Sequence, residues 1–201
     1  MRTLEADGRK NQDLKKRKQS LPRSIEISMI AILSATSISI AFVRSFLPNI
    51  EVTSLITFTS GFVFGSRIGG LIGGFTEGVS SIFNPLGPAP MPIFVGQVGC
   101  MLLIGVVGGV IGRFSDKTEM GNLNRSLMMG AAGLYLTVIY DLVTNLGFAF
   151  SFGLTYEEAL IYGLPFMIIH VFTNTLFFST VSPVLSRYML KTISIEGGYR
   201  D

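Results

Sequence analysis

The feature that most constrains this chain is a series of apolar runs long enough to cross a lipid bilayer. Hydrophobic residues make up 48% of the sequence and charged residues 14%, with a mean hydropathy of +0.53. A helix needs roughly 20 apolar residues to cross about 30 Å of hydrocarbon. Lipid offers no hydrogen-bond partner to an open backbone, so helices are the default spanning structure. The sequence therefore predicts an all-α, multi-pass protein of the cell membrane.

Six apolar runs separated by polar or Gly/Pro-rich breaks predict a six-transmembrane-helix bundle. The second and third runs are short, and two arrangements remain open for them. They form either a hairpin that crosses twice, which the polar break at Ser66 and Arg67 favours, or one re-entrant pair. The expected helices lie at about residues 24–47, 52–66, 68–83, 91–112, 126–151 and 159–186.

Basic residues predict the orientation of this bundle, because they mark the cytoplasmic side of short loops. With both termini in the cytoplasm, 15 of the 16 Lys and Arg residues fall on the inner side, and Arg44 is the exception. We expect three parts: a disordered basic tail at 1–23, a membrane domain at 24–190 and a short cytoplasmic tail at 191–201. The basic tail is interpreted as a topology-setting flank that contacts lipid rather than nucleic acid.

Several motifs are absent, and their absence limits the chemistry. The sequence contains no GxxxxGK[ST] loop, no GxSxG and no HExxH motif, and its single cysteine is Cys100. We expect no ATPase site, no metal or other cofactor, and no internal disulfide. An intramembrane enzyme stays open as a less favoured alternative.

The polar residues of the predicted spans lie nearer their outer ends. Asp141 and the only histidine, His170, fall at similar depths on adjacent antiparallel helices, so a hydrogen bond between them is expected. Each has an asparagine one turn away on its own helix. Caps and turns account almost equally well for the candidates at helix ends, and helix packing accounts equally well for His170. The candidate ligand-binding residues are Asn49, Glu77, Asn84, Gln97, Asp141, Asn145, His170 and Asn174.

This outward skew separates a pocket from a channel. A channel or proton relay requires polar groups through the whole membrane, whereas a pocket requires them only above an apolar floor. The cytoplasmic halves of the spans are mostly Gly, Leu, Ile, Val and Met. The sequence therefore favours a pocket that opens to the outside.

Small residues recur at four-residue steps in three of the spans. Glycines at 70, 74 and 78, with 69 and 73 beside them, and those of GVVGGVIG at 105–112 are interpreted as helix-packing positions. In the first span Ala31, Ala35 and Ser39 form a smooth groove that could dock a second membrane protein.

Three segments in this order resemble the substrate-binding S component of energy-coupling-factor (ECF) vitamin transporters. They are PNIEVTSLITFTSGFVFGSRIGGLIGG, YDLVTNLGFAFSFG and GLPFMIIHVFTNTLFF, and the likeness extends over nearly all of residues 24–188. The AILSA segment, with Ala31 and Ala35, is similar to the small-residue motif by which S components dock on their coupling subunit.

The resemblance implies a six-helix subunit that captures a vitamin or related micronutrient from outside. Its partners would be the ECF transmembrane coupling subunit and two ATPase subunits, which would supply the energy. The DLxTN and PFxxxHxxxN patterns resemble cobalamin-type or unassigned S components, in which His170 could ligate cobalt. A stand-alone membrane scaffold or cell-envelope assembly protein remains the main alternative.

Overall fold

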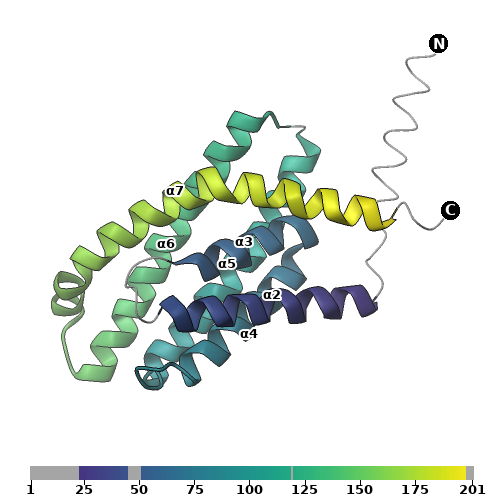
Figure 1. Ribbon diagram of the computed structural model, residues 1–201. Helices are drawn as coiled ribbons and strands as arrows, with labels where there is room; N and C mark the ends of the chain where they lie inside the picture. The colour runs from purple at the N-terminus through teal and green to yellow at the C-terminus, as the bar shows by residue number, and fades with distance from the viewer. Residues whose placement is uncertain (1–22, 45–50, 119, 198–201) are drawn as a thin grey trace, which may run out of the picture.

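The computed structural model describes residues 23–44, 51–118 and 120–197, and in these ranges all regular secondary structure is α-helical. Figure 1 shows the bundle that the helices form. This confirms the all-α prediction, and each of the six expected segments corresponds to one helix. The helices are α2 (Arg23–Arg44), α3 (Val52–Phe64), α4 (Ser66–Ile82), α5 (Met91–Lys117), α6 (Asn122–Phe152) and α7 (Tyr156–Gly197).

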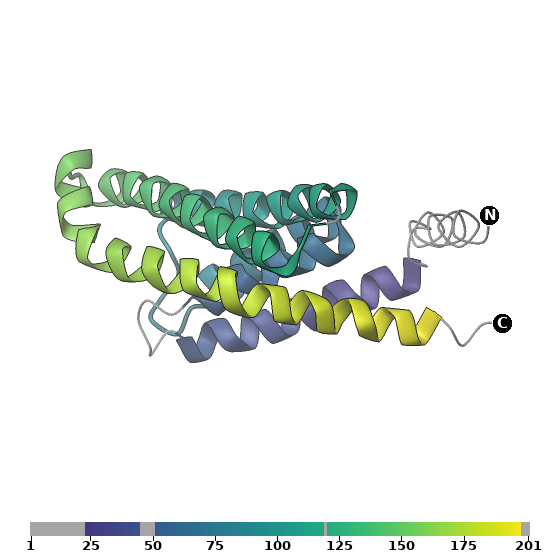
Figure 2. The same cartoon turned by 90° about the horizontal axis from the view of Figure 1, so that it is seen from above.

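Helix α3 occupies the centre of the bundle. It packs against α2, α4, α5 and α7, while α6 lies against α5 and α7 on the far side (Figures 1 and 2). Every residue of the run Thr53–Phe62 is buried. The aromatic ring of Phe58 meets that of Phe178 from α7 with centroids 4.8 Å apart. Helix α3 is therefore enclosed by protein along most of its length.

A single glycine folds α3 back onto α4. Gly65 has φ +99°, a conformation that side-chain-bearing residues rarely adopt. Gly61 and Gly69, four residues to either side of it, then face each other so closely that a Cβ at Gly69 would overlap the Gly61 backbone. The expected break at Ser66 and Arg67 lies one residue later than the observed one.

Glycines on α5 let this hairpin approach it at backbone distance. A Cβ on Gly108 or Gly112 would collide with carbonyl oxygens of α3, and one on Gly105 would collide with the backbone of α4. On α4 the close positions are Gly69 and Gly73, whereas nothing lies within 4 Å of a Cβ at Gly78. A Cβ at Gly70 or Gly74 would also contact side chains of α5, Val106 at 3.1 Å and Leu102 at 3.8 Å. The packing interpretation therefore holds for the other α4 glycines and for those of α5, but not for Gly78.

The outer surface of the bundle is apolar and suits contact with lipid. Helices α2, α5, α6 and α7 are long and apolar enough to cross a membrane. On α7, large side chains such as Ile161, Phe166 and Phe172 are each more than half exposed. Contiguous apolar surface of this kind is unusual on a soluble monomer. The chain has the features of an α-helical membrane protein.

The two short helices do not reach the length of a full crossing. At 1.5 Å per residue, α3 is about 20 Å long and α4 about 26 Å, against roughly 30 Å of hydrocarbon. The other helices extend further, and α7 continues to Gly197, into the segment expected to be a tail. Residues 1–22, which make up nearly all of the predicted basic tail, lie outside the described residues.

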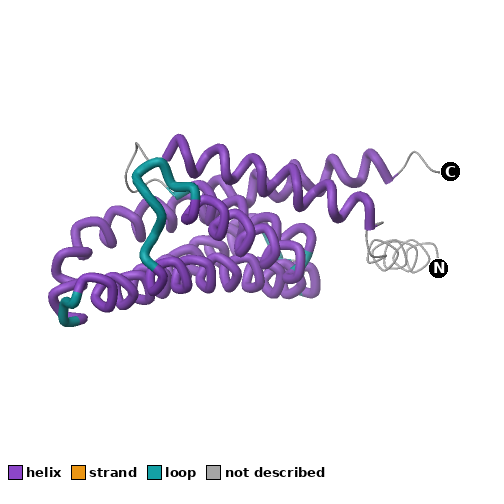
Figure 3. The backbone as a smooth tube through the Cα atoms, turned by 90° about the horizontal axis from the view of Figure 1, so that it is seen from below, coloured by secondary structure: helices purple, strands orange, loops and turns teal. Residues whose placement is uncertain are grey.

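The helix ends fall into two groups. Helix α2 begins and α7 ends at the same end of the bundle (Figure 1). The α3–α4 turn reaches this end too, because Arg67 at the start of α4 lies 3.9 Å from Glu26 in the first turn of α2. Among the described connections, the segment between α4 and α5 is the longest, and it lies away from this end (Figure 3).

Candidate functional site

The site is built around the contact between His170 on α7 and Asp141 on α6. The ring Nδ1 lies 2.8 Å from the carboxylate Oδ1, and the two side chains are 12% and 11% exposed. The two atoms are within hydrogen-bond distance, and the tautomer of the ring decides which of them donates. This confirms the expected contact between the two helices.

Asn174, one turn further along α7, holds the other nitrogen of the ring. Its amide nitrogen lies 3.1 Å from His170 Nε2, 3.0 Å from Thr137 Oγ1 and 3.4 Å from Ser54 Oγ. The amide thus joins α7, α6 and α3 while being only 1% exposed. With the amide donating, Nε2 accepts, and the ring is the neutral tautomer with its hydrogen on Nδ1.

Two oxygen atoms of this cluster are buried without a hydrogen-bond partner. They are Oδ2 of Asp141 and Oδ1 of Asn174. Exchanging the two ends of the Asn174 amide does not repair this, because its NH₂ group would then occupy the position that lacks a partner. Buried polar groups are paired in the great majority of cases, so each exception requires an explanation.

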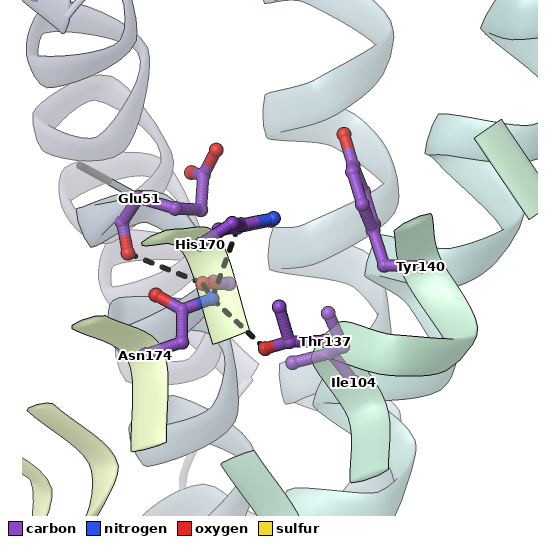
Figure 4. Close-up of a pocket in the computed structure, with 7 residues that line it drawn as sticks. Glu51, Ile104, Thr137, Tyr140, His170 and Asn174 are labelled. Carbon is purple, nitrogen blue, oxygen red and sulfur yellow. Dashed lines mark hydrogen bonds between the residues drawn. The ribbon is translucent and has the colours of Figure 1, made fainter. Parts of the chain in front are cut away.

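A small pocket lies against the same residues (Figure 4). Its walls stand close enough to exclude a water-sized sphere. Ligand pockets for drug-sized molecules measure roughly 300–1,000 Å³. A ligand must therefore displace side chains to enter. The lining residues are Glu51, Ser54, Ile104, Thr137, Tyr140, His170 and Asn174.

Glu51 was interpreted from the sequence as a helix-end residue, with a cap and ligand contact almost equally favoured, and it is not among the candidate ligand-binding residues. It precedes α3, is 4% exposed, and its Oε1 accepts hydrogen bonds from the backbone N–H and the hydroxyl of Thr53. A carboxylate at this position caps the helix and interacts favourably with its dipole. Figure 4 shows its carboxylate beside His170, with Tyr140 on the other side of the ring. The PNIEVTS segment contained a signal, a carboxylate directly before a helix start, but sequence alone did not place it beside α7.

Thr137 and Tyr140 were also missed, although both lie within one turn of Asp141 on α6. The Tyr140 ring is nearly perpendicular to the His170 ring, at 83° with centroids 5.8 Å apart. Their spacing from Asp141 places all three on one helix face. That face was a signal that could have identified them.

The other predicted asparagines have local roles. Asn145 donates to the Asp141 carbonyl oxygen at 2.7 Å, and Asn84 accepts the Leu86 N–H at 2.8 Å within a turn. The turn interpretation therefore describes Asn84 adequately. Asn49 lies outside the described residues.

Glu77 and Gln97 belong to a second polar cluster, between α4 and α5. The Ser81 hydroxyl lies 3.0 Å from Glu77 Oε1 and 3.1 Å from Gln97 Oε1. A hydroxyl has one hydrogen, so exchanging the Gln97 amide ends would let Gln97 donate to Ser81 and Ser81 to Glu77. Neither Glu77 nor Gln97 lines the His170 pocket. The eight candidates therefore do not form a single site.

The predicted docking groove lies on the outer face of α2. Ala31, Ala35 and Ser39 are exposed, whereas Ser34 and Ser37 point inward and are 1% and 0% exposed. The groove is thus available to another protein or to lipid.

Within the described ranges, no three His, Cys, Asp or Glu side chains converge as a metal site. Comparison of the chain with protein-family models, curated proteins and solved structures finds no match.

Proposed function

We propose that this protein is a membrane subunit that captures a small molecule for an uptake transporter, of the type of the ECF S components. The observation that carries the proposal is the pair of buried oxygen atoms without partners, one on Asn174, which lines the pocket, and one on Asp141, which contacts the lining residue His170. A bundle that needed polar groups only for packing would lose stability by leaving them unpaired. A ligand that donates hydrogen bonds would satisfy such atoms.

The position of the pocket supports capture from outside. The described basic side chains lie near the start of α2, the α3–α4 turn, the α5–α6 junction and the C-terminal part of α7. We assign this end to the cytoplasm by the positive-inside rule. The pocket is at the opposite end of α3, where Glu51 caps the helix. In this arrangement α3 and α4 form a hairpin packed against α2, α5 and α7.

Energy would come from partners. The exposed groove of Ala31, Ala35 and Ser39 would dock the transmembrane coupling subunit, because small residues allow close backbone approach in lipid. Two ATPase subunits would complete the transporter. The cargo would be a vitamin or related micronutrient, and a molecule as large as cobalamin would require the pocket to expand several-fold.

The ligand-binding half of the proposal is tested on the purified full-length protein in detergent. Cobalamin, riboflavin, biotin, thiamine and folate are screened by thermal shift, where stabilisation follows ligand concentration over Kd. Thr137→Val should then weaken binding of the stabilising vitamin about tenfold, the loss of one hydrogen bond. Thr144→Val is the matched control, because the Thr144 hydroxyl bonds only carbonyl oxygens of its own helix, Tyr140 and Asp141.

Three results would contradict the proposal. Absence of stabilisation by every vitamin would favour the alternative of a membrane scaffold. Equal affinities for the Thr137→Val and Thr144→Val variants would place the ligand elsewhere. Turnover of a bound compound that His170→Ala abolishes, with affinity retained, would indicate an intramembrane enzyme instead.

A further inference from the structure

Helix α7 divides into two parts that are held to the bundle very differently. From His170 onward, side-chain hydrogen bonds tie it to α3 and α6, and the Phe178 ring packs against α3. In the stretch 157–169, by contrast, no side chain is hydrogen-bonded to another helix within the described structure. Ala159 is the only buried residue of that stretch. The start of α7 is therefore attached far more loosely than the rest.

Gly163 and Pro165 stand between the two parts of α7. Pro165 has no N–H, so the Ile161 carbonyl lacks the donor that a regular helix supplies four residues further on. Prolines inside helices cause sharp kinks, and a neighbouring glycine makes the backbone more permissive. Figure 2 shows the green first turns of α7 turned away from the direction of its yellow part. The helix is thus bent in a stretch that contains both residue types that bend helices.

The first turns of α7 rest on the end of α6. A Cβ on Gly163 would overlap the Asn145 side chain, so the two helices touch at this glycine. Asn145 in turn donates to the Asp141 carbonyl oxygen, one turn away on α6. The Tyr156 hydroxyl donates to the Leu142 carbonyl oxygen at 3.1 Å. Among the described side chains of this segment, that is the one hydrogen bond that must break for it to leave α6.

The pocket begins just beyond the bend. Its α7 lining residues are His170 and Asn174, the next polar side chains inward along this helix that face α6. The pocket walls exclude a water-sized sphere, so a solute reaches these residues only after part of the wall moves. The segment before Pro165 is the neighbouring part of α7 that moves without breaking the contacts of His170 and Asn174.

We propose that Gly163 and Pro165 form a hinge that controls entry to the pocket. Residues 156–164 swing about it between a bent, closed position on Asn145 and a straighter position that uncovers the pocket. The inference rests on the proposed function, because it concerns how a ligand enters the same site. Ile161 and Tyr162 are 68% and 65% exposed, so their apolar surface faces outward already and little burial is lost on opening.

The rate at which a thiol on the pocket wall is alkylated measures how often the hinge opens. Thr137→Cys supplies that thiol in the full-length protein in detergent, with the only native cysteine replaced, Cys100→Ala. The probe is N-ethylmaleimide. Pro165→Ala restores the helix donor and favours the straighter form, so it should raise the alkylation rate about fivefold, the effect of one hydrogen bond. Pro183→Ala is the matched control in the anchored part of α7 and should leave the rate unchanged.

A disulfide tests the opposite direction. A Cβ on Gly163 would stand 3.0 Å from Asn145 Cγ, so cysteines at these two positions are close enough to join. With Asn145→Cys and Gly163→Cys oxidised, alkylation of the Thr137→Cys thiol should slow at least about tenfold, because only the closed form remains. Reduction should restore the rate, with mass spectrometry identifying the alkylated position. A rate that ignores the disulfide, or equal rates in the two proline variants, overturns the proposal.

The outcomes distinguish the hinge from the proposed function. A vitamin that binds through Thr137, in a protein whose alkylation rate responds to neither the disulfide nor Pro165→Ala, would leave the capture function intact and refute the hinge. Hinge-dependent alkylation in a protein that no vitamin stabilises would do the reverse.

Discussion

His170 is held at both ring nitrogens, by Asp141 at 2.8 Å and by Asn174 at 3.1 Å. The first contact joins α7 to α6, and the second lies within α7 and continues to α3 through Ser54. Since both contacts are largely buried, they hold the ring in one orientation. Three of the four helices that line the pocket, α3, α6 and α7, are thus connected through His170 and Asn174.

The connection between Asp141 and His170 should be measurable as a coupling energy. In a double-mutant cycle of Asp141→Ala and His170→Ala, we expect a coupling of about 1–2 kcal/mol, because each single variant leaves a buried polar group unpaired. Denaturant unfolding in detergent measures it. The control cycle combines Asp141→Ala with Thr180→Ala, whose hydroxyl bonds only its own helix at Leu176. Coupling as small as in the control would mean that the contact does not stabilise the bundle.

Two glycines of α4 and α5 should differ sharply in how well they tolerate substitution by alanine. Gly105→Ala forces a methyl group into the backbone of Gly69 and should cost about 1–3 kcal/mol of unfolding free energy. Gly78→Ala meets nothing within 4 Å and should be neutral or slightly stabilising, since alanine is the better helix former. Thermal unfolding in detergent distinguishes the two. Equal melting temperatures would contradict the close approach of α4 and α5.

A hydroxyl pair links α3 to α7 further along α3 from the pocket. Thr59 Oγ1 and Ser182 Oγ lie 2.8 Å apart, and both residues are 0% exposed. Ser182→Ala should cost about 0.6 kcal/mol, the mean for interhelical hydrogen bonds in membranes. Adding Thr59→Val should cost little more, because the second partner is then no longer left unpaired. Strictly additive losses would show that the two hydroxyls act independently.

Two alanines of α2 should respond differently to enlargement. Ala35→Trp, on the exposed groove, should leave the melting temperature within a few degrees of wild type and abolish co-purification with a coupling subunit. Ala41→Trp enlarges a residue that is 3% exposed, and should destabilise the protein by overpacking. Retained association in the Ala35→Trp protein would defeat the docking assignment.

Regular spacing made much of the site predictable. Asp141 and His170 lie on consecutive antiparallel helices joined by a short loop, so counting residues from the loop predicted that they would meet, and they do at 2.8 Å. The same reasoning placed Asn174 beside His170. Rise per residue and helix direction are local properties, so a sequence carries them.

The sequence could not place residues whose neighbours are distant along the chain. Glu51 reaches the pocket because α3 lies at the centre of the bundle. Glu77 and Gln97 fall outside it because both lie within hydrogen-bond distance of Ser81, between α4 and α5. Gly78 has the spacing of a packing residue yet faces open space.

The sequence by itself determined the all-helical class of fold and indicated a lipid environment, because apolar runs of this length suit helices that cross a bilayer. The tertiary structure alone decided which polar side chains share a cavity. That choice depends on how each helix is rotated about its axis, and the rotation is set by close contacts such as Gly105 against Gly69, which no periodicity along one helix specifies.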